Sequence, residues 1–217
     1  MFDATWWTSP LGQRVGLFLA TLLYGLQHSL LTSRGLKHAL KRRWGSRALQ
    51  IYRLAYNAWA GLSLLPLMAW TARLPHDRVL WAWPWPWALI ALGLQGLGLY
   101  LILDGLWRVG PLGFLGLRPE RAHLTCRGVY AWVRHPLYVG GLLLLWATPV
   151  LTLNMAVWYA ALSLYLLVGA WWEERKLRAE LGPAYDVYRA AVPMWLPRPP
   201  RGPLPCDDRN PTEPPAP

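Results

Sequence analysis

Apolar runs of about 20 residues recur along the chain, and shorter segments rich in Lys and Arg separate them. A run of that length, folded as an α-helix, is long enough to cross the hydrocarbon core of a bilayer. The pattern therefore predicts about five transmembrane helices. The expected spans are 11–31, 48–72, 87–107, 137–153 and 154–172.

The last two expected spans follow each other almost directly, near Thr152–Asn154. Helices joined this closely pack as neighbours, so we expect a tight antiparallel hairpin. Residues 181–193 predict a helix break and then a short amphipathic segment in the cytoplasm. The expected fold class is all-α, a polytopic integral membrane protein with one membrane-embedded domain over 1–196. The Pro-rich, apolar-poor segment 197–217 predicts a disordered cytoplasmic tail.

Composition and charge agree with a membrane protein, because 54% of the residues are hydrophobic and 16 are Trp. The net charge of +11 comes from Lys and Arg gathered in loops, which argues against nucleic acid as a partner. With five spans, the basic segments 34–47, 108–136 and 173–217 lie on one side of the bilayer. The positive-inside rule then places the N-terminus outside and the C-terminus in the cytoplasm, in a bacterial inner membrane.

The two cysteines, Cys126 and Cys206, are too few for a disulfide framework, a zinc site or a haem motif. We therefore expect no bound metal. The N-terminus lacks the basic region of a cleavable signal peptide, and the first apolar run is long enough to remain as a span.

A polar segment, Arg134-His135-Pro136-Leu137-Tyr138, stands directly before the fourth expected span. Pro136 suits the first turn of a helix, and a helix N-terminus with free N–H groups beside a guanidinium is a good anion site. The alternative is a basic membrane flank in which Arg134 extends to the bilayer surface and Tyr138 anchors the interface.

Two adjacent acidic residues, Glu173 and Glu174, close the fifth expected span. They oppose the positive-inside trend and lie at the end of a helix where the macrodipole disfavours negative charge. A cation should therefore compensate them. It is either local, from Arg175, Lys176 or Arg178, or it is the amine of a ligand, with hydroxyl groups as further possible partners.

The Gly-rich run 93–98 lies within the third expected span, and no strand precedes it, which excludes a dinucleotide-binding loop. Gly96 and Gly98 either let a neighbouring helix pack closely or let a cofactor approach the backbone. Tyr185 and Tyr188 share one helix face, as interfacial anchors or as an aromatic wall for a planar ring.

One histidine, His28, lies at the end of the first expected span, beside the basic loop. It is either a hydrogen-bonded residue at a helix end or a catalytic group.

Taken together, these motifs resemble the C-terminal half of the isoprenylcysteine carboxyl methyltransferase and phospholipid methyltransferase superfamily. The matching features are GxYxxxRHPxYxG over 128–140, the hairpin, the Glu pair, and LGxxYxxYRxxVP over 181–193. Residues 27–31, with Lys37 and Tyr52, are similar to the NnrU-like and methanethiol S-methyltransferase branch.

The resemblance implies an integral-membrane methyltransferase that uses S-adenosyl-L-methionine, bound at the cytoplasmic side. The implied acceptor is a small thiol, a prenylcysteine carboxylate or another apolar or lipid-like molecule. The implied catalytic residues are Arg134, Glu173, Arg189 and His28. The implied cofactor-binding residues are Gly96, Gly98, Tyr130, Arg134, His135, Pro136, Tyr138, Gly140, Glu173, Glu174, Tyr185 and Tyr188.

Within that site, Arg134 or His135 would hold the carboxylate of the cofactor, and the two glutamates would hold its ammonium group or ribose hydroxyls. The tyrosines would contact the adenine or the sulfonium. Two alternatives remain. One is a non-catalytic NnrU-like accessory membrane protein, and the other is an NADPH-dependent membrane reductase of the steroid 5α-reductase type.

Overall fold

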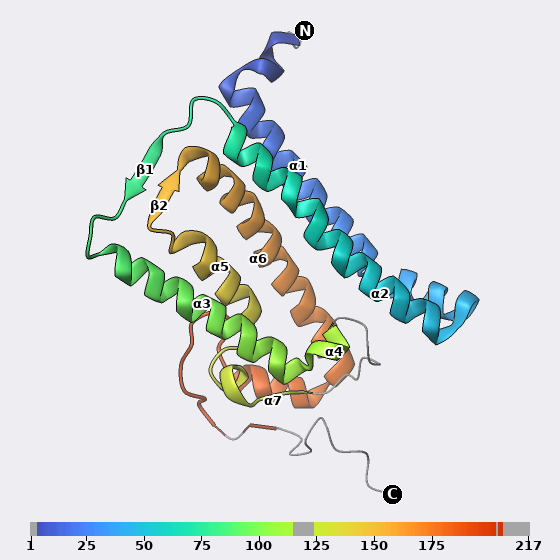
Figure 1. Ribbon diagram of the computed structural model, residues 1–217. Helices are drawn as coiled ribbons and strands as arrows, with labels where there is room; N and C mark the ends of the chain where they lie inside the picture. The colour runs from blue at the N-terminus through green and yellow to red at the C-terminus, as the bar shows by residue number, and fades with distance from the viewer. Residues whose placement is uncertain (1–3, 115–123, 203, 206–217) are drawn as a thin grey trace, which may run out of the picture. The chain divides into compact units, whose positions relative to one another are not determined.

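The computed structural model describes residues 4–114, 124–202 and 204–205 (Figure 1). The chain is mostly helical, as expected, and divides into two compact units. Unit 1 comprises Met1–Gln95 and Leu145–Val168, and unit 2 comprises Gly96–Leu144 and Gly169–Pro217. Each unit is described by itself below.

Unit 1 begins with a short 3-10 helix, η1 (Ala4–Thr8), followed by α1 (Pro10–Leu31). Ser9 caps α1, because its side-chain oxygen accepts a hydrogen bond from the backbone N–H of Gly12 at 3.0 Å. Figure 1 shows α1 beside α2 (Arg34–Arg73). Tyrosine hydroxyls join the two helices: one of α1 donates to a carbonyl of α2, and one of α2 donates to a carbonyl of α1.

The basic segment 34–47 is helical, so the expectation of a loop there is wrong. Lys and Arg are good helix formers, and their charge alone does not distinguish a solvated loop from a solvated helix. The helix is interrupted at Gly45, whose φ of 81° lies in the left-handed region that glycine adopts without strain.

Two short strands of unit 1 were not expected. The strands β1 (Val79–Ala82) and β2 (Val150–Thr152) pair antiparallel, with Val79 opposite Thr152 and Ala82 opposite Val150. The alternation of Trp and Pro over 81–87 is typical of an interfacial belt and not of a strand, so the sequence gives little sign of β1. Strand β2 also shortens the fourth expected span.

Accordingly, α5 (Pro136–Trp146) has 11 residues, and α6 (Leu153–Leu181) begins only after β2. The expected single helix over 137–153 is therefore wrong, and the turn of the expected hairpin does not lie at 152–154. Whether α5 and α6 form the tight hairpin stays a prediction.

Among the described residues, two helices are long and apolar enough to cross a membrane, α3 (Ala88–Val109) and α6. The bent pair α1–α2 makes a third candidate if it counts as one span. Large apolar side chains such as Leu23 and Leu62 are exposed, although unit 1 has its own core of Leu17, Leu67, Leu74 and Trp158. Exposed apolar surface on long apolar helices identifies an integral membrane protein. The count of five spans stays a prediction.

In unit 2, α3 and α5 pack closely at two glycines. A Cβ atom on Gly98 would lie 2.8 Å from the carbonyl oxygen of Gly140, and a Cβ on Gly140 would meet the carbonyl oxygen of Gly98. Helix packing on small residues therefore accounts for this pair. A Cβ on Gly96 would meet no described atom within 4 Å.

The remaining elements of unit 2 are α4 (Pro111–Phe114), η2 (Gly128–Ala131) and α7 (Pro183–Ala191). Beyond α7, backbone N–H groups of Arg198 and Arg201 donate to the carbonyls of Trp132 and Ala191. The start of the expected disordered tail is thus attached to unit 2. Residues 203 and 206–217 of that tail lie outside the described residues.

Candidate functional site

Three segments of unit 2 contribute the candidate site. Arg134 and His135 immediately precede α5, the two glutamates lie near the end of α6, and Tyr185 lies on α7. Pro136, as expected, begins α5, and it is buried.

Glu174 is the centre of this arrangement. Arg134 donates to it through two nitrogens, Nε to Oε1 at 2.9 Å and Nη2 to Oε2 at 3.1 Å. His135 Nε2 lies 2.8 Å from Oε1, and the hydroxyl of Tyr185 donates to the same oxygen at 2.7 Å. The side chains of Arg134 and Glu174 are only 9% and 12% exposed. A buried carboxylate is stable here because a bidentate guanidinium and further donors satisfy it.

The rest of the Arg134 guanidinium binds the end of α7. Its Nη1 donates to the carbonyl of Val192 at 2.6 Å and to that of Arg189 at 3.1 Å, and its backbone N–H donates to Pro193. The carbonyls of Arg189 and Val192 lie at the end of α7, where a helix leaves its carbonyls without partners. Arg134 therefore ties the start of α5, the end of α6 and the end of α7 together. The sequence had suggested instead that it holds an anion of the ligand.

The two adjacent glutamates have different surroundings. Glu173 is 41% exposed at its side chain, and its Oε2 lies 3.8 Å from His135 Nδ1. The carboxylate of Glu174 is enclosed by protein donors, so Glu173 is the member of the pair that remains accessible.

Two of the three local cations expected to compensate the acidic pair have other partners. The Arg175 guanidinium lies 3.6 Å from the ring centroid of Trp171, and Arg178 pairs with Asp186 at 3.0 Å. The compensating charge on Glu174 comes from Arg134 instead. A second guanidinium, on the partly exposed Arg189, lies 3.6 Å from Glu174 Oε2.

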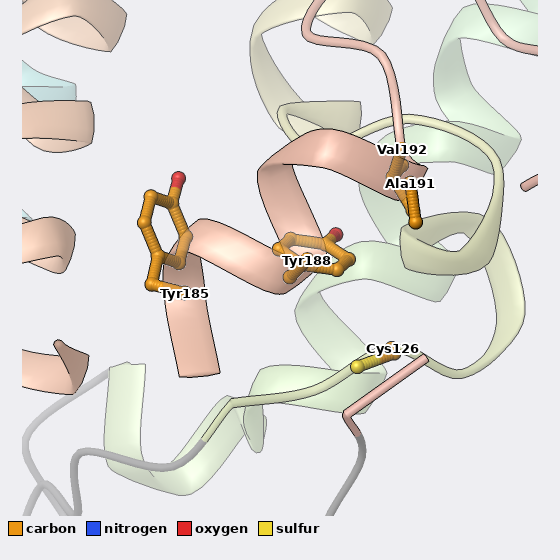
Figure 2. Packing of buried hydrophobic residues seen from close by; sticks show 5 residues of the cluster. All are labelled: Cys126, Tyr185, Tyr188, Ala191 and Val192. Atoms are coloured by element: carbon orange, nitrogen blue, oxygen red, sulfur yellow. The ribbon is translucent and has the colours of Figure 1, made fainter. Parts of the chain in front are cut away.

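Tyr185 and Tyr188 do share one face of α7, but they are neither surface anchors nor an open aromatic wall. They are 1% and 2% exposed and pack in a core with Cys126, Ala191 and Val192, as Figure 2 shows. The Tyr188 hydroxyl donates to the carbonyl of Tyr130 at 2.7 Å.

Burial raises the pKa of both phenols on α7, Tyr185 and Tyr188. The hydrogen bond from Tyr185 to Glu174 raises the pKa of Tyr185 further, because a carboxylate acceptor disfavours a phenolate. Both hydroxyls therefore remain protonated donors at neutral pH.

Asp104 of α3 is part of this region, and the sequence analysis missed it. Its carboxylate accepts from the backbone N–H of Val129 at 3.0 Å and from Arg108 at 3.2 Å, and it thereby holds η2. Burial, and after it the charges of Glu173 and Asp104, raise the pKa of Tyr130. An acidic residue inside an apolar run was the signal that could have identified Asp104.

Tyr138 lies in the first turn of α5. Its ring contacts the His135 ring edge to face, with 5.5 Å between the centroids, and an added Cβ on Gly169 of α6 would lie 3.4 Å from it. The structure thus brings Tyr138 together with His135.

His28 belongs to unit 1, whereas all the other candidate residues belong to unit 2 or, for Gly96 and Gly98, to the part of α3 within it. Its ring lies among three tyrosine rings.

Comparison with known proteins identifies one matching family model and several similar proteins. The model of the phospholipid methyltransferase family matches residues 87–181. A methanethiol S-methyltransferase of Mycobacterium tuberculosis is 34% identical over 212 residues, which cover 89% of this chain and 82% of the relative. Methanethiol S-methyltransferase 2 of Bradyrhizobium diazoefficiens is 32% identical over 85% of this chain and 73% of the relative.

A third relative, a methanethiol S-methyltransferase of Crocosphaera subtropica, is 29% identical over 81% of this chain and 71% of the relative. No solved structure matches the chain significantly. The similarity to the first two relatives extends over most of both chains, and the family model covers the segment from α3 to the end of α6. The chain therefore belongs to the membrane methyltransferase family that includes these methanethiol S-methyltransferases, and it is a methyltransferase.

Proposed function

We propose that this protein transfers a methyl group from S-adenosyl-L-methionine to a small thiol of the methanethiol type, which produces a thioether. The observation that carries the proposal is the 34% identity, over 89% of the chain, to a relative named for methanethiol S-methylation. The proposal excludes the two alternatives left open by the sequence, an accessory protein without activity and an NADPH-dependent reductase.

The accessible residues of unit 2 fit the charges of this methyl donor. The donor carries an ammonium group and ribose hydroxyls, which are hydrogen-bond donors, and a carboxylate, which is an acceptor. The partly exposed carboxylate of Glu173 suits the ammonium or the hydroxyls, and the partly exposed guanidinium of Arg189 suits the carboxylate. Tyr130 and Tyr138 offer aromatic rings near these charges.

The buried network around Glu174 would then act by positioning. The hydrogen bonds to Glu174 fix this part of α6 and thereby the position of its neighbour Glu173. Through Arg134 the same network fixes the end of α7, where Arg189 lies. Rigid placement of binding groups is what methyl transfer requires, because the donor is already activated by its sulfonium.

In this reaction the thiol sulfur forms a bond to the methyl carbon, and the bond from that carbon to the donor sulfur breaks. The donor is left as S-adenosyl-L-homocysteine, and the thiol proton is released. The thiolate is the reactive form of a thiol, so the acceptor site must favour loss of that proton.

We further propose that the donor site opens to the cytoplasm, with the N-terminus outside and the C-terminus inside. Lys and Arg are concentrated in the segments that this topology places in the cytoplasm.

The full chain, purified in detergent or reconstituted in nanodiscs, tests the function directly. We expect dimethyl sulfide and S-adenosyl-L-homocysteine to form in equal amounts from S-adenosyl-L-methionine and methanethiol. A prenylcysteine and phosphatidylethanolamine serve as competing acceptors in parallel reactions. Methylation of either one, with no methylation of the thiol, would refute the proposed acceptor class.

A further inference from the structure

The His28 ring in unit 1 lies among three aromatic rings from three helices. The centroid of its ring is 6.4 Å from that of Tyr24 on α1, 6.5 Å from that of Tyr56 on α2 and 6.2 Å from that of Tyr165 on α6. Tyr165 also packs directly against Gly25, where an added Cβ would lie 2.5 Å from its ring. The cluster is therefore built by close packing.

Within the part of the chain that the structure describes, no hydrogen bond to the His28 ring is formed. This differs from the simpler expectation of a hydrogen-bonded residue at a helix end. The neighbouring hydroxyls are engaged elsewhere, since Tyr24 donates to the carbonyl of Ala60 at 3.1 Å and Tyr165 is hydrogen-bonded with Ser29. The ring nitrogens of His28 are thus available to a ligand.

The charge beside this cluster selects the kind of ligand. Aromatic rings alone favour cations, but the ammonium group of Lys37 already lies 5.6 Å from the ring centroid of Tyr56. A second cation would be repelled by Lys37, whereas an apolar molecule that becomes an anion would be stabilised. A small thiol has this property, and its sulfur makes favourable contacts with aromatic rings.

We propose that the cluster of Tyr24, His28, Tyr56, Tyr165 and Lys37 binds the thiol acceptor, and that His28 removes its proton. This inference rests on the proposed function. The S–H bond breaks, the proton passes to a nitrogen of the neutral imidazole, and both electrons of the bond remain on sulfur. The product of this step is the thiolate, the reactive form of the acceptor, and His28 then returns its proton to water.

The test compares His28→Gln with His38→Gln, which changes an exposed histidine of the same unit. At neutral pH we expect His28→Gln to lower kcat with methanethiol by about 100-fold or more, the usual contribution of a general base. Affinity for S-adenosyl-L-homocysteine, measured by calorimetry, should not change in either variant. Full activity of His28→Gln with methanethiol would overturn the inference.

A second acceptor separates proton removal from a packing defect. An aromatic thiol that is already ionised at the assay pH needs no base, so His28→Gln should methylate it within a few-fold of the unsubstituted protein. An equally large loss with both thiols would show that His28 is not the proton acceptor, and would overturn the inference.

The experiment also distinguishes the two proposals. A protein with native His28 that binds S-adenosyl-L-homocysteine but methylates no thiol refutes the proposed function itself. If thiol methylation does not depend on His28, only the proposed role of His28 is refuted. If His28→Gln does not fold, Lys37→Gln tests the cluster instead, because loss of the charge that stabilises the bound thiolate should raise KM for both thiols. An unchanged KM for both thiols would overturn the inference.

Discussion

Two polar side chains, Glu174 of unit 2 and His28 of unit 1, have opposite kinds of surroundings. In unit 2, Glu174 is saturated by hydrogen bonds from Arg134, His135 and Tyr185. In unit 1, His28 is surrounded by aromatic rings and forms no hydrogen bond among the described residues. A saturated charge stabilises the fold and has little capacity for a ligand, whereas an unbonded ring nitrogen retains its capacity to bind or take a proton. The comparison indicates that the Arg134–Glu174 network is largely structural, whereas His28 retains the capacity that the proposed role requires.

The largest effect expected is from breaking the saturated network. Arg134→Ala removes the bidentate partner of the buried Glu174 carboxylate, and breaking a buried ion pair in this way typically costs about 3–5 kcal/mol. The thermal midpoint of the purified protein in detergent should fall sharply. The control Arg178→Ala breaks an exposed pair with Asp186 and should cost about 0–1 kcal/mol. Similar losses in the two variants would show that the network does not stabilise the fold.

A smaller effect is expected from removing single hydroxyl groups of α7. Tyr185→Phe removes a hydrogen bond to a carboxylate, which is worth about 1.5–3 kcal/mol, and Tyr188→Phe removes one to a neutral carbonyl, worth about 0.5–1.5 kcal/mol. Each variant loses one tyrosine hydroxyl from the same core, so each is a control for the other. Chemical denaturation should rank Tyr185→Phe as the less stable, and the reverse order would contradict the central position of Glu174.

Glu173 should affect ligand binding and leave stability almost unchanged. Glu173→Gln removes a partly exposed charge, so we expect unfolding to change by less than about 0.5 kcal/mol. Affinity for S-adenosyl-L-homocysteine should fall about tenfold, equivalent to about 1.4 kcal/mol. Lys176→Gln, three residues further along α6, is the matched control and should keep its affinity. A Glu173→Gln variant with undiminished affinity would remove Glu173 from the proposed donor site.

The smallest effect at neutral pH is expected from titration of the buried phenols. The pKa of Tyr185 and that of Tyr188 are raised in the folded state, chiefly by burial. The stabilisation is therefore complete below the ordinary tyrosine pKa of about 10 and is lost as the pH rises above it. Thermal midpoints should be constant from neutral pH to about 9 and should then fall, and the double variant Tyr185→Phe/Tyr188→Phe should show a weaker alkaline decline. An equal decline would assign the alkaline loss to other groups.

The sequence by itself determined the helical class, the membrane setting and the motifs of the candidate site. The length and periodicity of the apolar runs are properties of the chain alone. The helices α1, α3 and α6 therefore begin within one residue of their expected positions. The family could be identified for a related reason, because the motif around Arg134 and the Glu pair keep their order and spacing.

Only the tertiary structure decided which side chains face inward. Adjacent residues such as Glu173 and Glu174 lie about 100° apart around a helix. Whether one of them is enclosed depends on where α5 and α7 pack, which no local pattern specifies. The same holds for Tyr185 and Tyr188 and for the strand pair, because burial and pairing are created by distant segments. The aromatic surroundings of His28 follow the same rule, since their rings come from α1, α2 and α6.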